Sequence, residues 1–268
     1  VGKGSATQRQ VAAGAARVCA ERGCDAVLLL GDNLYPRGME ADDDPRMDAW
    51  IGETYRGLGA PVYLVVGNHD YGHGRDKARA AREIAWADRT PGFEFPANAW
   101  VADAGPARII GLDTNAMFQF GARFQGQWLH DRLAESDARW KIVVGHHPYR
   151  SEGPHGNAGT YDDTRLVPFV SGGELREVFD RELCGAVDLY AAGHDHSRQL
   201  LEWCGTSLIV SGAGASATPI VGHGNRVSFA EGSPGGVWVE VGDVDGRVAF
   251  FDADGFWQSE FPIAPTSR

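Results

Sequence analysis

No stretch of this sequence approaches the apolar length of a membrane-spanning helix, and the chain contains neither an internal repeat nor a linker-like segment. Basic residues are few, with 25 Lys and Arg against 36 Asp and Glu, so the formal net charge is −11. Because nucleic-acid binding needs a cluster of Lys and Arg, this composition argues against a nucleic-acid partner. With 268 residues, of which 43% are hydrophobic, the chain can bury one large core, so we expect a single domain over residues 1–268.

Cysteine is scarce, and no pair has the Cys-x-x-Cys spacing of redox and zinc motifs. Cys184 and Cys204 flank a predicted strand and its neighbour, while Cys19 and Cys24 lie on either side of a predicted helix end at Gly23. We therefore expect two disulfides, and with them an exported protein, periplasmic or secreted. Reduced thiols buried in the core are the main alternative, and zinc ligation is another.

Short apolar runs alternate with helical patterns along most of the chain. The expected helices lie at about 6–22, 45–57, 77–88, 125–135 and 173–183. Residues 237–261 alternate between apolar and polar, and Asp245-Gly246 and Asp254-Gly255 are typical of hairpin turns. This order predicts an α+β fold, a four-layer αββα sandwich of two mixed β-sheets flanked by helices.

Polar side chains follow four of the predicted strands, at the point where each strand ends. The four segments are Gly31-Asp32-Asn33-Leu34-Tyr35, Gly67-Asn68-His69-Asp70, Gly145-His146-His147-Pro148 and Gly193-His194-Asp195-His196. Because loops at strand ends let a rigid scaffold aim several side chains at one point, we expect these segments to meet. Their carboxylate, amide, phenol and imidazole groups suit iron, zinc or manganese better than copper(I).

At these residues the sequence resembles the calcineurin-like metallophosphoesterases, and within them the small, tartrate-resistant-type purple acid phosphatases. The superfamily pattern is Asp-x-His or Gly-Asp-x-Gly, then Gly-Asp, Gly-Asn-His-Asp/Glu, a His, and Gly-His-x-His. Tyr35, three residues after Asp32, matches the tyrosine that distinguishes the purple branch, and Asp195 and His155 also match. The resemblance continues in Leu112-Asp113-Thr114, in Ser211-Gly212-Ala213-Gly214 and from Gly235 onward, so it covers nearly the whole chain and implies the metallophosphatase fold.

The resemblance implies two metal ions and a small phosphorylated substrate. A ferric ion is expected at the Tyr35 site, because a hard phenolate suits a trivalent cation, and Fe(II), Zn or Mn at the second. His69 and His155 are expected to face the substrate, and the sequence suggests that Asp70 orients the His69 ring. The implied ligands are Asp32 as the bridge, Tyr35 and His196 on the first ion, and Asn68, His146 and His194 on the second.

The activity so implied is acid-phosphatase-type hydrolysis of phosphate monoesters, in which metal-activated hydroxide attacks phosphorus in line and His69 or His155 protonates the leaving oxygen. A phosphodiesterase or nucleotide hydrolase of the same superfamily is an alternative. We expect a monomer. His147 is assigned no catalytic role, and His73, His130 and His223 fit no motif and are interpreted as structural.

One departure from the family pattern concerns the first motif. Gly-Asp-x-Gly should precede the first helix, yet the chain opens at Val1-Gly2-Lys3-Gly4-Ser5 and has no aspartate before Asp25. We expect a fragment of the catalytic domain that lacks the N-terminal strand and the first ligand aspartate. The alternative is a variant with a degraded first metal site, which would favour a non-catalytic metal-binding module.

Overall fold

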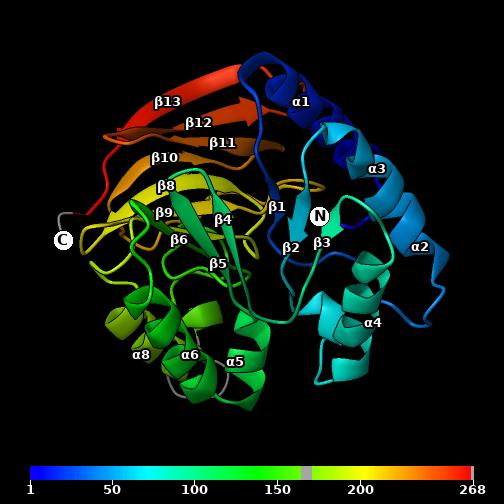
Figure 1. The fold of residues 1–268 in the computed structure, drawn as a ribbon, viewed down its shortest axis with the longest axis horizontal. Coiled ribbons are helices and arrows are strands. Elements are labelled where there is room, and N and C mark those ends of the chain that lie inside the picture. The colour runs from blue at the N-terminus through cyan, green and yellow to red at the C-terminus, as the bar shows by residue number, and fades with distance from the viewer. Residues whose placement is uncertain (164–170, 267–268) are drawn as a thin grey trace.

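The computed structural model describes residues 1–163 and 171–266, and a seven-stranded mixed sheet lies at its centre (Figure 1). The inner strands β5, β6, β7 and β9 are parallel, and the outer strands pair antiparallel. Parallel strands covered on both faces are near-continuous apolar runs, as β6 is. In spatial order the strands are β10 (Val227–Glu231), β8 (Arg198–Trp203), β9 (Thr206–Ser211), β7 (Leu189–Ala192), β6 (Trp140–Gly145), β5 (Ala107–Gly111) and β4 (Trp100–Ala104).

Two smaller sheets form the second sheet layer. One is parallel and consists of β1 (Val27–Leu29), β2 (Val62–Leu64) and β3 (Phe93–Glu94). The other is the predicted antiparallel meander and consists of β11 (Gly235–Val241), β12 (Gly246–Asp252) and β13 (Trp257–Ile263). Within these two sheets, β1 and β11 are both edge strands.

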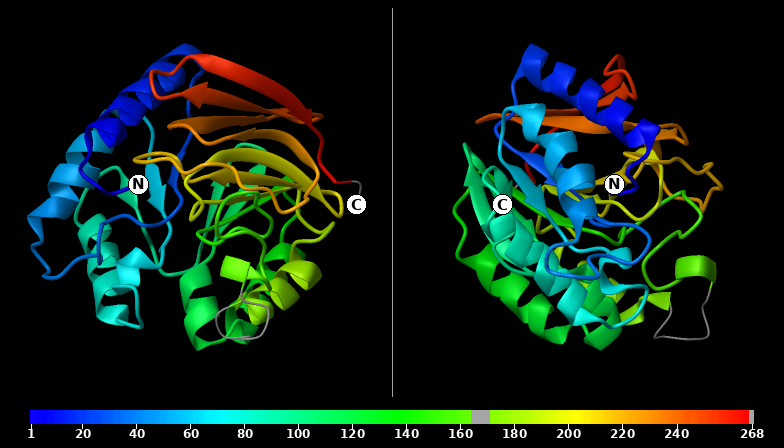
Figure 2. Two further views of the ribbon diagram at one scale, coloured as in Figure 1. Left: turned by 180° about the vertical axis from the view of Figure 1, so that it is seen from behind. Right: turned by 90° about the vertical axis from the view of Figure 1, so that its right-hand side faces the viewer.

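Helices cover the outer faces of both sheet layers, as Figures 1 and 2 show. One group lies against the large sheet, and the other accompanies the small sheets. The first group is α5 (Thr114–Phe120), α6 (Arg123–Ala134) and α8 (Gly173–Glu182), and the second is α1 (Ala6–Arg22), α2 (Pro45–Met47), α3 (Glu53–Tyr55) and α4 (Lys77–Asp88). The predicted sandwich of two sheet layers between helices is confirmed.

The core has two parts, one on each face of the large sheet. Between the sheet layers, Ile109 and Val144 pack in one cluster with Leu64 and Phe250 of the small sheets. On the opposite face, strand residues such as Val143 join α6 and α8 in a second cluster. Alternate residues of one strand therefore serve different cores, as the two-residue period of a strand requires.

The predicted helix over 45–57 is not a single helix. It consists of α2, a π-helical turn at Asp48–Gly52, α3 and a 3-10 turn at Arg56–Leu58. The Gln8 amide donates a 2.6 Å hydrogen bond to the carbonyl of Trp50, and a side chain that inserts in this way disturbs the helical ladder. Helix α5 was not predicted, although Asp113 caps it by accepting from the Ala116 N–H.

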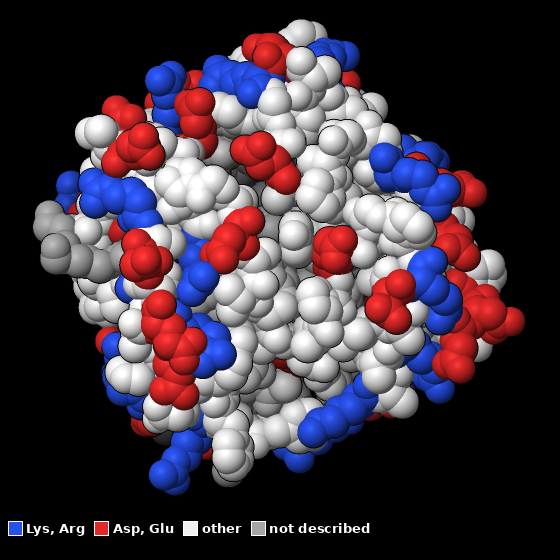
Figure 3. All heavy atoms as spheres, viewed as in Figure 1, with Lys and Arg blue, Asp and Glu red and all other residues white. Residues whose placement is uncertain are grey.

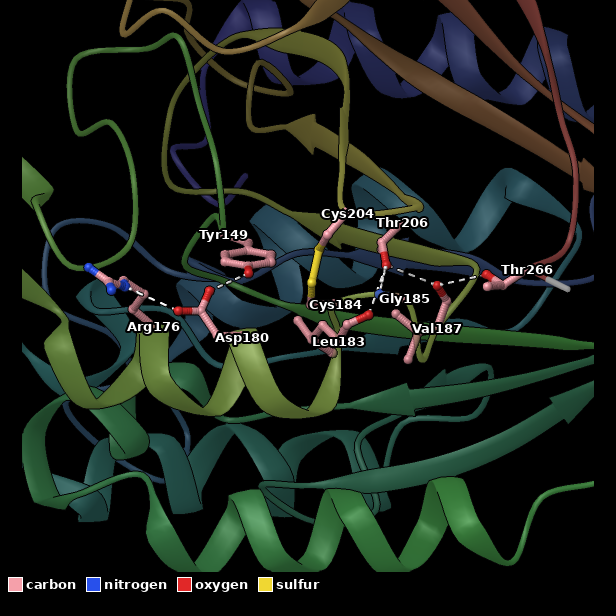
Figure 4. Close-up of a disulfide and its surroundings, with 10 residues drawn as sticks. All are labelled: Tyr149, Arg176, Asp180, Leu183, Cys184, Gly185, Val187, Cys204, Thr206 and Thr266. Carbon is pink, nitrogen blue, oxygen red and sulfur yellow. Dashed lines mark hydrogen bonds and ion pairs between the residues drawn. A yellow bond between two sulfur atoms is a disulfide. The ribbon is translucent and has the colours of Figure 1, made fainter. Parts of the chain in front are cut away.

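Both expected disulfides are present, Cys19–Cys24 at the end of α1 and Cys184–Cys204 between α8 and β8. Figure 4 shows the second beside Thr206, whose hydroxyl bonds the carbonyl of Leu183 and so ties β9 to the end of α8. Within residues 1–163 and 171–266, no helix is long and apolar enough to cross a membrane. The face in Figure 3 carries interspersed acidic and basic side chains rather than one continuous basic area.

Candidate metal centre

The four polar segments meet where β1, β2, β6 and β7 end. Asp32 and His194 have backbone φ angles of 56° and 64°, in the left-handed region that turns each side chain toward the common point. The glycines that precede them in the motifs provide space. A Cβ at Gly31 would lie 2.5 Å from Nδ1 of His146, and one at Gly67 would lie 2.2 Å from Oδ1 of Asp32.

A first set of donors gathers on one oxygen of Asp32. The Tyr35 hydroxyl donates to Oδ2 of Asp32 at 2.7 Å and lies 3.1 Å from Nε2 of His196. The other ring nitrogen of His196, Nδ1, is 3.0 Å from the hydroxyl of Ser216. Ser216 therefore orients the ring through Nδ1, while Nε2 faces the site.

A second set gathers on the other oxygen. Nε2 of His146 lies 3.4 Å from Oδ1 of Asp32, 3.0 Å from Oδ1 of Asn68 and 3.1 Å from Nδ1 of His194. Nδ1 of His146 donates to the carbonyl of Leu30 at 2.8 Å, which leaves the lone pair of Nε2 facing the other donors. Each carboxylate oxygen of Asp32 thus contacts a different set, Oδ2 through Tyr35 and Oδ1 through His146.

The donor chemistry of these sets fits metal ions. Two ligands that share a cation through bonds of about 2.0–2.2 Å lie close to 3 Å apart, and the separations between these side chains run from 2.7 to 3.4 Å. A group of three or more His, Cys, Asp or Glu side chains arranged to hold a metal is absent from the described residues. Beside Asp32 and the histidines, one set adds the phenol of Tyr35 and the other adds the amide of Asn68.

The ionisation states also suit ligands. Burial alone would raise the pKa of Asp32, but the neighbouring His146 and His69 hold it below its usual range. Burial lowers the pKa of His196 to about 4 and that of His194 well below its usual value. An ionised carboxylate and neutral imidazoles are the forms that bind cations. Burial, with Asp32 beside it, raises the pKa of Tyr35, so a cation there would have to displace the phenol proton.

His69 lies at the rim of this cluster. Nδ1 is 2.7 Å from the carbonyl of Pro36, and Nε2 is 3.9 Å from Oδ2 of Asp32. Asp70 points elsewhere, because its carboxylate accepts from the backbone N–H groups of Gly67 and Leu34 at 2.8 and 3.1 Å. The carbonyl of Pro36, and not Asp70, is therefore the acceptor that orients the His69 ring.

His155 reaches the cluster from the loop that follows β6. Its ring stacks on that of His194 with 4.1 Å between centroids, and its Nδ1 lies 2.7 Å from Oδ1 of Asp162. The backbone N–H of His155 donates to Asp195 at 2.9 Å, and the buried Asp195 also accepts from Ser151. Asp195 thus positions the loop that carries His155.

A sequence model described as "Calcineurin-like phosphoesterase" matches residues 8–198. The chain belongs to this family. Purple acid phosphatase 4 of Arabidopsis thaliana is 30% identical over 78% of this calcineurin-like phosphoesterase, which spans only 64% of that relative's length. Tartrate-resistant acid phosphatase type 5 of Rattus norvegicus is 26% identical, over 93% of this chain and 82% of its own.

Solved structures show the same fold at low identity. A purple acid phosphatase from yellow lupin, Lupinus luteus, matches 97% of the chain and 49% of its own length, with a TM-score of 0.69 and 17% identity. GAP50 of Plasmodium, described as the anchor in the inner membrane complex, matches 100% of this chain and 87% of its own, with a TM-score of 0.78 and 17% identity.

Two histidines of this calcineurin-like phosphoesterase lie beside the site although the sequence assigned neither of them a role there. The ring of His73 is 3.7 Å from that of His69, and the ring of His147 is 4.7 Å from that of His194. The signal for His73 was its position four residues after His69 in a glycine-rich turn. His130 instead pairs with Glu182, away from the cluster.

Proposed function

We propose that the protein hydrolyses small phosphate monoesters at a centre of two metal ions. The observation that carries the proposal is the sharing of Asp32. Its Oδ2 contacts the hydroxyl of Tyr35 and, through it, His196, while its Oδ1 contacts His146 and, through it, Asn68. Fe(III) is proposed at the Tyr35 side, and Fe(II), Zn or Mn at the other. Two cations held there would polarise phosphoryl oxygens and lower the pKa of a water molecule.

The surrounding residues supply positioning and a proton. With Nδ1 held by the carbonyl of Pro36, the Nε2 atom of His69 faces the cluster and is placed to protonate the leaving oxygen. His155, stacked on His194 and bonded to Asp162, is proposed as the second group that faces the substrate. Asp70 acts as a positioning residue, because it holds the backbone at Gly67 that carries Asn68 and His69.

Other observations agree with an acid phosphatase. The family and the named relatives support phosphoesterase chemistry, and two disulfides are compatible with an exported enzyme. The formal net charge of −11 does not oppose a phosphate ester, because bound cations would set the local field. We expect the enzyme to act as a monomer.

The decisive experiment combines elemental analysis with two substrates. We expect two metal ions per chain, one of them iron, and faster turnover of p-nitrophenyl phosphate than of bis-p-nitrophenyl phosphate. Tyr35→Phe should remove the visible phenolate-to-iron absorption, while His130→Gln, remote from the cluster, should leave the spectrum unchanged. Preference for the diester would assign a phosphodiesterase. Metal binding without any turnover would instead indicate a non-catalytic metal-binding module. This alternative is tested because one protein of the same fold, GAP50, is described as an anchor.

A further inference from the structure

A glutamate with no exposed surface lies in the middle of helix α4, which packs beside β3 and the loop that follows β2 (Figure 1). This residue, Glu83, and its neighbour Asp70 are both 0% exposed. Among the described residues, neither acid pairs with a lysine or an arginine. Because a buried carboxylate without a cation is costly, two such acids in one place point to a role beyond packing.

The side chain of Asn33 connects both acids to the candidate metal centre. Asn33 follows Asp32, and its Nδ2 atom faces three acceptors. They are the carbonyl of Val65 at 2.9 Å, Oδ2 of Asp70 at 3.2 Å and Oε2 of Glu83 at 3.1 Å. An amide nitrogen carries only two hydrogens, so the three acceptors compete for them. The other oxygen of Glu83, Oε1, accepts no hydrogen bond in the described part of the chain.

The same count of donors shows which acid carries a proton. Asp70 accepts from the backbone N–H groups of Gly67 and Leu34, so its negative charge is well supported. Glu83 has at most the one donor of Asn33. Burial raises the pKa of Glu83 well above its usual value, and the charge of Asp70 raises it further. Glu83 is therefore the neutral acid, and its O–H group donates to the Asp70 carboxylate.

Asp70 in turn links two of the loops that carry candidate ligands. Its Oδ1 accepts from the N–H of Leu34, two residues after Asp32, at 3.1 Å. Its Oδ2 accepts from the N–H of Gly67, the residue before Asn68, at 2.8 Å. A group that fixes the carboxylate of Asp70 thus fixes both loops at once.

We propose that Glu83 is a positioning residue of the metal centre. It donates a hydrogen bond to Asp70 and accepts one from Asn33. Because these two partners lie in different loops, Glu83 sets the separation of Asp32 and Asn68. The role in metal binding rests on the proposed function, whereas the neutral state of Glu83 does not.

Two replacements of Glu83 test the role in metal binding. Glu83→Gln keeps the shape and supplies a neutral donor and acceptor, so we expect Zn²⁺ affinity in isothermal titration to stay within about twofold of the native value. Glu83→Leu fills a similar volume but leaves Asp70 and Asn33 without their partner, and should weaken Zn²⁺ binding roughly tenfold or more. Equal affinities for the two variants would overturn the proposal.

Ile84→Ala is the matched control on the same helix. It shortens an apolar side chain that packs against the core, so it should lower the midpoint of thermal unfolding and leave Zn²⁺ affinity unchanged. A loss of affinity in this variant equal to that of Glu83→Leu would overturn the proposal, because it would show that any weakening of α4 loosens the site.

Infrared difference spectroscopy of the metal-free protein tests the neutral acid directly. At neutral pH we expect a carboxylic-acid C=O stretching band in the native protein that Glu83→Gln removes. No difference between the two spectra would show that Glu83 is ionised, which contradicts the hydrogen bond to Asp70. Because this band needs no metal, it distinguishes failure of this inference from failure of the proposed function.

Discussion

At the residue scale, His69 offers the sharpest test of the proton donor. We expect His69→Ala to reduce kcat/KM for an alkyl phosphate by roughly 10²-fold or more, and to affect p-nitrophenyl phosphate much less, because that leaving group needs little protonation. Steady-state kinetics on both substrates measure the difference. His130→Ala serves as the control, since this histidine is 59% exposed and pairs only with Glu182 in the described structure. Equal losses on the two substrates would remove His69 from the proton-donor role.

Asp44 shows how one carboxylate supports the segment that carries Tyr35. Hydrogen bonds from Arg46, at 2.6 and 2.9 Å, lower the pKa of Asp44 to about 2, and Arg46 also reaches the carbonyl of Tyr35. Since the folded pKa is below the unfolded value, the stabilisation is complete above about pH 4 and is lost as the pH falls toward 2.

We therefore expect Asp44→Asn to lower the free energy of unfolding by about 1 kcal/mol at pH 6, a figure reduced for solvent screening, and by almost nothing near pH 2. Asparagine retains the helix cap, so the difference isolates the charge. Urea unfolding of both proteins at pH 6, 4 and 2 measures it. A difference that stays constant with pH would show that the Arg46 pair does not contribute through ionisation.

At the element scale, the strand-end glycines set how closely the segments approach. We expect Gly67→Ala to weaken metal binding at least tenfold, because its Cβ would lie 2.2 Å from Oδ1 of Asp32. Gly57→Ala is the matched control, since no atom lies within 4 Å of its added Cβ. Isothermal titration with Zn²⁺ measures affinity, and circular dichroism confirms the fold. Equal affinity for both variants would show that the loops move apart without cost.

Local signals made most elements predictable. α1 and α4 have the bounds that the sequence predicts. Their first turns are capped by Ser5 and Asp76, and a glycine follows α1. The segmentation at 45–58 was not predictable, since it depends on Gln8, distant in sequence, reaching the carbonyl of Trp50. α5 had a cap signal at Asp113, but only seven residues follow it, too few for a helical period to stand out.

The candidate site was likewise predictable where it depends on local sequence and not where it depends on residues distant in sequence. Strand ends and residue types identified the four segments, and the structure brings all six proposed ligands together. The pairing of His69 with Pro36 could not be predicted, because no pattern links an imidazole to a carbonyl 33 residues away.

At the scale of the whole molecule, the two disulfides close loops of different length. Loss of Cys184–Cys204, with 20 residues of separation, should cost about 3 kcal/mol of unfolding free energy, and loss of Cys19–Cys24, with 5, about 2 kcal/mol. Urea denaturation of Cys184→Ser/Cys204→Ser and Cys19→Ser/Cys24→Ser compares them. A larger loss for the shorter loop would show that chain entropy does not dominate.

The contact between Tyr35 and His196 joins positions 161 residues apart, one following β1 and the other following β7. Each set of donors beside Asp32 consequently combines residues from both sheet layers, and its members separate whenever the layers do. An ion bound between them would act as a cross-link, so its dissociation rate should report the opening of the sandwich itself. Chelation would then release a mechanical constraint as well as a reactant, and metal-free protein should become susceptible to proteases between its two halves before either half unfolds.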